Sequence, residues 1–366
     1  MCIPRNKSKI EENKKSICIV SPFPPPDGGM AVQAERLVSK IRGEGWNVIP
    51  IETNPDLFKS LKVFSNVKGL RTVIRTFIFL KNLYRALPQV DVVYFLTGFF
   101  NFFFWVTYPA LILIILFRKR VILSAHGGEA ELFFKKYGFF IRPILNSVDA
   151  ISVPSGFLKD VFESSFNIDV KIIPNMIDLD QFQYRERVSL QPKIVVTRSL
   201  EEIYNVDCVI RAFKIIHDQY PQSILGIVGD GSQRERLENA VKAFGLKEFV
   251  VFYGRVNHSR IQELYNSYDI YMNASNVDNL PLVILEAFAS GLPVVTTKAG
   301  GIPYIVEDGV TGLLADKEDS RGLAELVIKL LKEPEKALRL AQNARRESQK
   351  YSWENVRPLL FSLLEE

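Results

Sequence analysis

Short apolar segments alternate with helical segments along this chain, and the pattern runs twice in succession. The first series opens with strand-like residues 16–21 and 47–51, separated by a loop with Gly28 and Gly29 and by a helical stretch over 30–43. It continues with apolar runs near residues 92–96, 121–125, 149–153 and 171–173. Near-continuous apolar strands are typical of parallel sheets that helices cover on both faces. The first series therefore predicts an open α/β sheet whose first unit is of the nucleotide-binding type.

A second series begins at residue 193, after the polar, charged stretch 181–191. It predicts strands near 193–196, 223–228, 249–252, 270–272 and 293–296, and helices near 206–219, 233–244, 258–267, 281–290 and 320–332. Two such series in 366 residues predict two doubly wound α/β domains with a boundary near residue 184. The ligand site is expected in the cleft between them, because the carboxyl ends of both sheets face it.

Cysteine and histidine are too sparse for a disulfide framework or a metal centre. Cys2, Cys18 and Cys208 lie far apart with no C-x-x-C pair, which is typical of a reducing compartment. Only three histidines occur, and none has a second histidine at helical spacing. We therefore expect no protein-built metal site. A bound cofactor is not expected either. The composition, 47% hydrophobic and 24% charged, excludes a disordered or fibrous chain.

The stretch between Asp56 and Asp91 contains no acidic residue. Its seven basic residues alternate with apolar ones, which predicts a basic amphipathic helix over about 58–85, as in proteins that bind an anionic membrane surface. The alternative is a core-packed helix whose solvent-facing side is basic. The many Phe and Ile residues argue against a nucleic-acid partner. The basic residues are Lys59, Lys62, Lys68, Arg71, Arg75, Lys81 and Arg85.

Residues 97–117 carry no charge over 21 positions, which is long enough for a membrane-spanning helix. Pro109 lies within the segment and strand-like runs flank it, so we expect instead a very hydrophobic helix that is buried or abuts a membrane. The segment includes an aromatic cluster from Phe99 to Trp105. The first fifteen residues show no apolar signal-peptide core. Together these features predict a cytoplasmic protein bound peripherally to the inner face of the cytoplasmic membrane.

Residues 278–295, which read DNLPLVILEAFASGLPVV, are the most informative stretch. Asn279 can cap a helix that Pro281 opens, and a glycine and a proline end that helix. The free backbone N–H groups at its start would attract phosphate. Asp278 precedes the helix and Glu286 lies within it, so two carboxylates could accept hydrogen bonds from the hydroxyls of a nucleotide sugar. Ordinary helix capping beside a surface glutamate is the alternative.

These residues resemble the retaining, nucleotide-sugar-dependent glycosyltransferases of family 4, which adopt the GT-B fold. The family has two acidic residues separated by seven, the second opening an E-A-x-A-x-G-x-P-V-V run, and Asp278 and Glu286 match them. Further motifs follow in family order along most of the chain. They are Gly28-Gly29, His126-Gly127, Ile173-Pro174-Asn175 with Asp178 and Phe182, Gly229-Asp230-Gly231, Gly254-Arg255-Val256, Gly300-Gly301 and 308–312.

The resemblance implies a GT-B fold, in which two doubly wound Rossmann-like domains face each other across a cleft. It also implies four catalytic residues. Glu286 would bind the donor ribose, Asp278 the donor sugar hydroxyls, and Arg198 the diphosphate, to which a guanidinium is well matched. His126 would give a hydrogen bond to the transferred sugar. The donor-binding set is Gly28, Gly29, Arg198, Gly231, Val256, Asp278, Leu280, Leu282, Val283 and Glu286.

The chain departs from the family pattern at several positions. Tyr204 stands where the family usually has a lysine, so half of the usual diphosphate clamp is missing or comes from elsewhere. Asp278 replaces the usual glutamate, and Pro281 and Met176 stand where glycine is common. These changes keep the class but leave the donor's identity open.

The resemblance therefore implies a metal-independent, retaining glycosyltransferase of cell-surface polysaccharide or lipopolysaccharide biosynthesis. Its donor would be a nucleotide sugar, and its acceptor a glycan or a lipid-linked molecule bound by the basic, aromatic-rich N-terminal domain. Two alternatives stay open. One is a nucleotide-sugar epimerase of the same architecture, and the other is a catalytically inactive protein that only binds sugar nucleotides.

The last predicted helix follows Tyr351. Ser352 is a suitable N-cap, and four apolar residues follow at helical spacing: Val356, Leu359, Leu360 and Leu363. As is usual in the resembled family, we expect this helix to pack back on the first domain. Residues 1–183 and 352–366 would then form the N-terminal domain, and residues 184–351 the C-terminal one. The alternative is a helix that stays with the second domain.

Overall fold

The computed structural model describes residues 15–25, 28–55 and 68–366, so residues 58–67 of the predicted basic helix lie outside it. The described chain separates into two compact units. The first contains the described part of Met1–Ala125 together with Phe139–Ile151, and the second contains His126–Gly138 and Ser152–Glu366. The predicted grouping of residues 1–183 with residues 352–366 stays a prediction.

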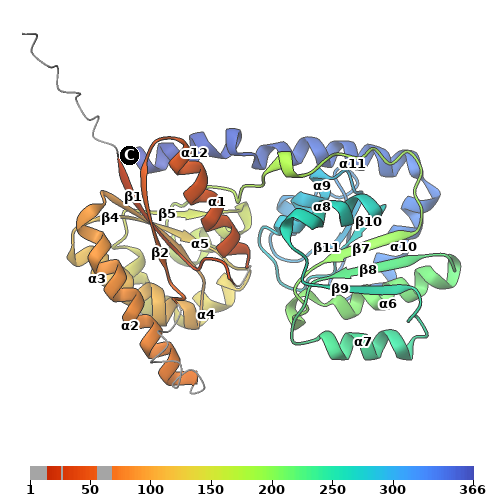
Figure 1. Ribbon diagram of the computed structural model, residues 1–366, viewed down its shortest axis with the longest axis horizontal. Helices are drawn as coiled ribbons and strands as arrows, with labels where there is room; N and C mark the ends of the chain where they lie inside the picture. The colour runs from red at the N-terminus through yellow and green to blue at the C-terminus, as the bar shows by residue number, and fades with distance from the viewer. Residues whose placement is uncertain (1–14, 26–27, 56–67) are drawn as a thin grey trace, which may run out of the picture. The chain divides into compact units, whose positions relative to one another are not determined.

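The first sheet has six strands in the order β2-β1-β3-β4-β5-β6. The chain enters at an interior strand, moves outward to β2 and then continues on the other side of β1, which is the predicted doubly wound topology (Figure 1). The strands are β1 (Ser16–Ser21), β2 (Asn47–Glu52), β3 (Val92–Thr97), β4 (Arg120–Ala125), β5 (Ala150–Val153) and β6 (Lys171–Ile172). The helices are α1 (Gly29–Gly43), α2 (Lys68–Ala86), α3 (Tyr108–Leu116), α4 (Ala130–Leu145) and α5 (Gly156–Phe166).

The second sheet, with the order β12-β11-β10-β7-β8-β9, lies wholly in the second unit. Its chain also starts at an interior strand, and the direction reverses between β9 and β10, so β7 and β10 flank the switch point. The predicted strands and helices of this series are all present, and β12 and α11 are additional. The strands are β7 (Lys193–Thr197), β8 (Ile224–Val228), β9 (Val250–Gly254), β10 (Ile270–Met272), β11 (Val294–Thr297) and β12 (Leu313–Ala315). The helices are α6 (Val206–Gln219), α7 (Arg234–Ala243), α8 (His258–Ser267), α9 (Leu282–Ala289), α10 (Ser320–Lys332), α11 (Pro334–Ser348) and α12 (Trp353–Glu365).

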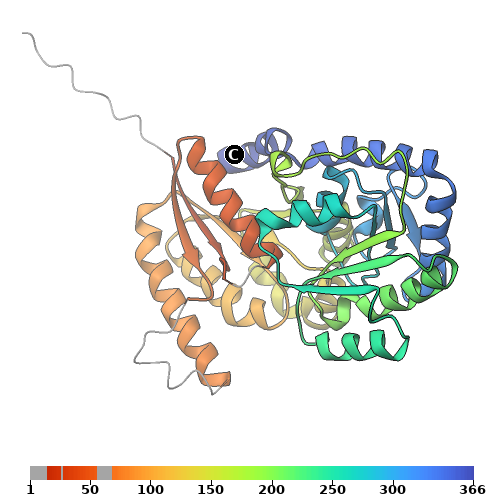
Figure 2. The same ribbon diagram turned by 45° about the vertical axis from the view of Figure 1, so that its right-hand side comes forward.

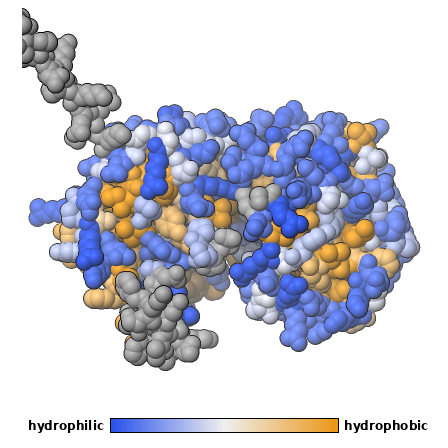
Figure 3. Space-filling model, in the orientation of Figure 1, coloured by the Kyte–Doolittle hydropathy of each residue, from blue (hydrophilic) through white to orange (hydrophobic). Residues whose placement is uncertain are grey.

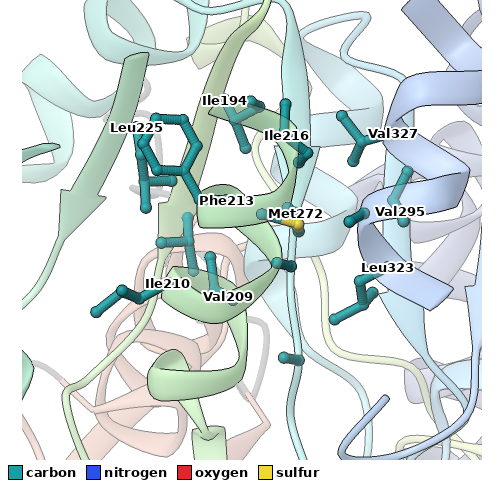
Figure 4. Close-up of a cluster of buried hydrophobic side chains, with 14 of the residues drawn as sticks. Ile194, Val209, Ile210, Phe213, Ile216, Leu225, Met272, Val295, Leu323 and Val327 are labelled. Atoms are coloured by element: carbon teal, nitrogen blue, oxygen red, sulfur yellow. The ribbon is translucent and has the colours of Figure 1, made fainter. Parts of the chain in front are cut away.

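Helix α6 anchors the second sheet through its apolar face (Figure 4). Its buried side chains recur at helical spacing: Val209, Ile210, Phe213 and Ile216. They belong to one core cluster with Ile194 of β7, Met272 of β10 and Val327 of α10. Full burial of one such side chain contributes roughly 1.5–3 kcal/mol. This packing fixes the positions of β7 and β10, whose carboxyl ends carry polar residues.

The uncharged segment 97–117 does not form one continuous α-helix. Strand β3 ends at Thr97, and a π-helical turn, η3 (Phe103–Thr107), leads into α3. Pro109 has no N–H to donate to the carbonyl of Trp105 four residues earlier, and that carbonyl accepts from Thr76 Oγ1 of α2 at 3.2 Å. Helices α2 and α3 pack side by side (Figures 1 and 2). Within residues 15–25, 28–55 and 68–366, no helix has the length and apolar character needed to cross a membrane.

The last helix, α12, starts one residue after Ser352, as predicted, but the Ser352 side chain makes no capping hydrogen bond. Val356, Leu360 and Leu363 are buried, whereas Leu359 is half exposed. The buried face of the helix therefore contains three of the four predicted apolar residues. The packing of this helix on the N-terminal domain stays a prediction.

Candidate active site

The switch point of the second sheet brings polar residues from neighbouring strands together. Arg198 directly follows β7, and Asn273 directly follows β10, which pairs with β7. Asp278 lies five residues further on, in the loop before α9. Because parallel strands present their carboxyl ends at one edge of a sheet, these three residues converge there.

The Arg198 guanidinium is held on two edges and one face. Its Nη2 forms an ion pair with Asp278 Oδ2, and its Nε donates to Asn273 Oδ1 at 3.0 Å. The ring of Tyr204 lies over it, with the ring centroid 4.7 Å from Arg198 Cζ. The side chains of Arg198 and Asp278 are only 9% and 10% exposed. The structure thus brings two predicted catalytic residues into direct contact.

Burial and pairing set the charges of Arg198 and Asp278. Burial acts to lower the pKa of Arg198, but the Asp278 carboxylate, with smaller contributions from nearby tyrosines, raises that pKa above its ordinary value. Burial raises the pKa of Asp278, and the Arg198 guanidinium opposes that rise. Asp278 Oδ1 also accepts the backbone N–H of Asn279 at 3.1 Å. The guanidinium therefore stays charged at neutral pH.

Glycines let the surrounding loops approach the backbone of this pair closely. Gly229 has φ = +138°, and a Cβ there would overlap the carbonyl oxygen of Arg198. Gly300 has φ = +50°, and a Cβ there would overlap the carbonyl oxygen of Asp278. A Cβ on Gly231, a predicted donor-binding residue, would crowd neighbouring backbone in the same way. These glycines are therefore required by packing around the site.

Helix α9 begins without a side-chain cap. Its first residue is Leu282, and Pro281 occupies the N-cap position. The prediction that Asn279 caps this helix was wrong, because Asn279 Oδ1 accepts instead from the Ser155 hydroxyl. The first backbone N–H groups, at Leu282 and Val283, have no acceptor within the helix and lie at the positive end of its dipole.

Four predicted donor-binding residues have apolar side chains that pack in the second unit. Leu280 is buried, and Leu282, Val283 and Val256 are partly buried against the same core cluster. Their contact with a donor stays a prediction.

Glu286 is buried within α9, and its carboxylate has a protein partner. The residue is only 5% exposed, so the alternative of a surface glutamate was wrong. The hydroxyl of Tyr265 donates to Glu286 Oε2 at 3.1 Å and also lies 2.9 Å from Thr197 Oγ1. One buried network therefore joins the predicted ribose-binding carboxylate to the end of β7.

His126 directly follows β4 and belongs to the same compact unit as Asp278. The loop that it begins approaches Asp278, since a Cβ on Gly128 would lie 3.1 Å from the Asp278 backbone nitrogen. Burial lowers the pKa of His126 to about 4. The imidazole is therefore neutral at neutral pH and can hydrogen-bond a hydroxyl without serving as an acid.

Gly28 and Gly29 lie in the first unit, at the start of α1. A Cβ on either residue would meet no described atom within 4 Å, and neither has a positive φ. Packing within the described residues therefore does not require glycine here. Their predicted role at the donor stays a prediction.

The two described cysteines, Cys18 and Cys208, are buried and unpaired. Burial raises the pKa of Cys18 to about 12 and that of Cys208 to about 11, so neither thiol is an activated nucleophile. In the described part of the chain, no group of three or more His, Cys, Asp or Glu side chains is arranged to hold a metal ion.

Sequence reasoning missed two residues of this site, Asn273 and Tyr265. A signal for Asn273 was present, because it is the first polar residue after the apolar strand at the switch point. Tyr265 lies on the apolar side of α8, where its spacing is the same as that of an ordinary core residue.

Two family descriptions match adjoining parts of the chain. Residues 27–181 match Glycosyltransferase Family 4, and residues 180–347 match Glycosyl transferases group 1. Together the two matches span residues 27–347, which contain every strand of the two sheets except β1.

Two bacterial enzymes have related sequences. The chain is 28% identical to a GDP-mannose-dependent alpha-(1-6)-phosphatidylinositol monomannoside mannosyltransferase of Mycolicibacterium smegmatis, over 60% of this chain and 63% of that protein. It is 29% identical to the N-acetyl-alpha-D-glucosaminyl L-malate synthase of Bacillus anthracis, over 62% of each chain. The chain thus spans less than two thirds of the length of these relatives.

A crystal structure of HepE from Anabaena, in complex with UDP and glucose, matches 96% of this chain and 99% of its own with a TM-score of 0.73. The sequence identity is 18%, so this likeness concerns the fold. The two doubly wound sheets, the ordered motifs and the two family matches lead to one conclusion: the chain belongs to the group 1, or family 4, glycosyltransferases, which have the GT-B fold.

Proposed function

We propose that this protein transfers a sugar from a nucleotide sugar to a glycan or lipid-linked acceptor, with retention of configuration and without a metal ion. The proposal rests on the environment of Arg198. Its side chain is buried and charged, and only some of its N–H groups bind other residues of the protein. Two of its five N–H groups donate to Asp278 and Asn273, and the others have no acceptor among the described residues. A buried guanidinium with free N–H groups is suited to the oxygens of a diphosphate.

The start of α9 would contribute a second source of positive potential. Its first uncapped N–H group, at Leu282, lies four residues after Asp278 in the sequence, and Asp278 is the ion-pair partner of Arg198. As the glycosidic bond breaks, negative charge grows on the leaving diphosphate, and donors that are already oriented stabilise it without reorganisation. Glu286 would hold the ribose with the carboxylate oxygen that Tyr265 does not occupy. The neutral imidazole of His126 would hydrogen-bond the transferred sugar.

The donor class is the first point to test, because one of the relatives uses GDP-mannose and HepE binds UDP. We expect a thermal-shift screen of UDP-, GDP- and ADP-sugars to find a donor that raises the melting temperature of the full chain. A ligand at about 100 times its Kd stabilises the folded state by roughly 2.7 kcal/mol. Absence of any shift with all three classes at millimolar concentration would contradict a nucleotide-sugar site.

The same preparation separates the transferase from its alternatives. An epimerase converts the sugar of the donor without an acceptor, whereas a transferase releases nucleoside diphosphate in proportion to glycosylated acceptor. A catalytically inactive protein binds the donor and gives neither product.

We further propose that the first unit attaches to an anionic membrane surface, at the inner face of the cytoplasmic membrane, where a lipid-linked acceptor is found. Helix α2 buries Phe79 and Leu83 but also has an apolar stripe that faces outward. The stripe residues are spaced by three, four and seven positions: Leu70, Val73, Phe77 and Tyr84. Lys81 and Arg85 of the same helix are exposed beside them. An apolar stripe flanked by basic residues is typical of interfacial helices.

Helix α3, which packs against α2, adds Ile112 and Leu116 to the exposed apolar residues, one turn apart. Figure 3 shows apolar surface between hydrophilic residues on this unit. Exposed apolar residues gathered on neighbouring helices favour a docking surface over a fully solvated face.

Flotation with vesicles tests this surface. We expect the protein to float with anionic vesicles and not with zwitterionic ones, and to be released by salt, since each basic residue near the surface is worth about 1 kcal/mol. Replacement of Phe77 and Leu116 by serine should lower binding at least about tenfold, because these side chains are 71% and 72% exposed and would enter the interface.

The matched control is Val188→Ser in the second unit, where the side chain is 70% exposed but lies outside α2 and α3. It should float like the unaltered protein. Equal binding to anionic and zwitterionic vesicles, or release only by detergent, would contradict attachment by this surface.

A further inference from the structure

Tyr204, which stands where a lysine is usual, lies against the guanidinium that would bind the diphosphate. Its ring centroid is 4.7 Å from Arg198 Cζ, within the range of a cation–π contact. The ring is half buried, so less water competes with this contact than at an exposed site. The contact joins residues at the end of β7 and in the turn η5 (Glu202–Tyr204).

The backbone of the turn fixes where the ring lies. The N–H of Tyr204 donates to the carbonyl of Glu201 at 3.1 Å, and the next residue, Asn205, adopts a left-handed conformation with φ = 45°. Asn205 also caps α6, because its Oδ1 accepts the N–H of Cys208 at 3.3 Å. The ring is therefore held between the end of a central strand and the start of a core-packed helix.

Three contacts then define the orientation of Arg198. Asp278 and Asn273 hold two edges of the guanidinium plane, and Tyr204 covers one face. The contacts fix the plane but leave the Nη1 edge without an acceptor among the described residues. Orienting a side chain before binding lowers the entropy cost of binding, because the ordered rotamer is already populated.

We propose that Tyr204 is a positioning residue, which holds Arg198 ready for the diphosphate of the donor by covering one face of its guanidinium. The inference rests on the proposed function of Arg198 as the diphosphate-binding residue. The chain departs from its family at this position, where tyrosine replaces the usual lysine. The inference assigns the role of Tyr204 to its aromatic ring and not to its phenol hydroxyl.

The ring and the hydroxyl can be separated by substitution in the full chain. Tyr204→Phe keeps the stacked ring, whereas Tyr204→Leu and Tyr204→Gln remove it. The probes are UDP, GDP and ADP, titrated by calorimetry, and the corresponding nucleoside, followed by ligand-observed NMR. We expect Tyr204→Phe to bind the preferred nucleoside diphosphate within about twofold of the unaltered protein, and the non-aromatic variants to bind it about 3- to 10-fold more weakly.

Two readouts distinguish positioning from a general structural effect. Affinity for the nucleoside, which has no phosphate, should be unchanged in both non-aromatic variants. In an Arg198→Ala background, Tyr204→Leu should cause no further loss of diphosphate affinity, because the ring acts through the arginine. Two non-aromatic variants are used so that misfolding of one, detected by circular dichroism, leaves the other to decide the outcome.

The inference is overturned if both non-aromatic variants bind the diphosphate as the unaltered protein does, if they lose nucleoside and diphosphate affinity equally, or if their effect adds fully to that of Arg198→Ala. Failure of the proposed function has a different signature. In that case the unaltered protein binds none of the nucleotides, or Arg198→Ala alone leaves diphosphate affinity unchanged.

Discussion

Replacing Arg198 with alanine is expected to lower kcat by about 10²–10³-fold while donor affinity falls less, by about tenfold or less. The side chain is 9% exposed and remains charged beside Asp278, so its field acts in a site with little water. Its attraction for the diphosphate grows as negative charge develops on the leaving group, which places most of its contribution in the transition state. Steady-state kinetics with a working donor and acceptor measure this division between kcat and KM.

Glu286→Ala and His126→Ala are expected to give contrasting results in the same assay. Hydrogen bonds from ribose to Glu286 are similar in the ground and transition states, so donor KM should rise more than kcat falls. His126→Ala should retain donor binding and lose transfer, because its neutral imidazole would contact only the transferred sugar.

Folding controls accompany these variants, since Arg198→Ala leaves the buried Asp278 carboxylate without its partner. Arg198→Lys keeps the charge and loses the planar fork, and it should fold like the unaltered protein but retain only part of the activity. If folded Arg198→Ala and Glu286→Ala proteins showed unchanged kinetics, the assignment of this site would be wrong.

Replacing Arg187 with alanine is expected to destabilise the second unit by about 3–5 kcal/mol, a loss of roughly 6–20 °C in melting temperature. Arg187 lies in the stretch before β7 and is only 3% exposed. Its guanidinium donates to three backbone carbonyls of other segments, those of Tyr265 at 2.7 Å, Tyr268 at 3.0 Å and Ser290 at 2.8 Å. Burial lowers the pKa of Arg187 to about 10, so it is still charged at neutral pH.

The alanine variant would leave those carbonyls, and the nearby Asp269 carboxylate, without this donor in a buried site. Arg321→Ala is the matched control, because Arg321 on α10 is 83% exposed at its side chain and, in the described part of the chain, pairs only with Glu325 one turn away. Such a surface pair contributes about 0.3–0.5 kcal/mol. Thermal melts in which the two variants behave alike would show that the Arg187 network contributes little.

Much of the fold could be predicted because strands and helices depend on local periodicity. Helix α6 has the predicted bounds, and α9 lies within one residue of them at both ends. Strand β12 was not predicted, and its three residues are held as a strand by pairing with β11. The end of the chain was less well predicted, because Leu359 fits the helical spacing but is 48% exposed.

The candidate site was predicted as a set of residues and not as a set of contacts. Asp278 and Arg198 are 80 residues apart in sequence, and no local pattern indicates that they pair. The sequence suggested that Asn279 caps α9, whereas its side chain binds Ser155, 124 residues away. A side-chain oxygen with several donors within reach accepts from the one that the tertiary structure brings closest.

The amino-acid sequence by itself determined the two α/β series, the strand that precedes each motif and the residue types available to the site. Only the tertiary structure decided that Tyr204 stacks on Arg198, that Tyr265 holds Glu286 and that Arg187 is buried in a stretch whose sequence is typical of a linker. The physical reason is the distance along the chain over which each kind of interaction acts. Periodicity acts over a few neighbouring residues, whereas hydrogen bonds and ion pairs require atoms within about 3–4 Å, which distant segments reach only when the sheets have formed.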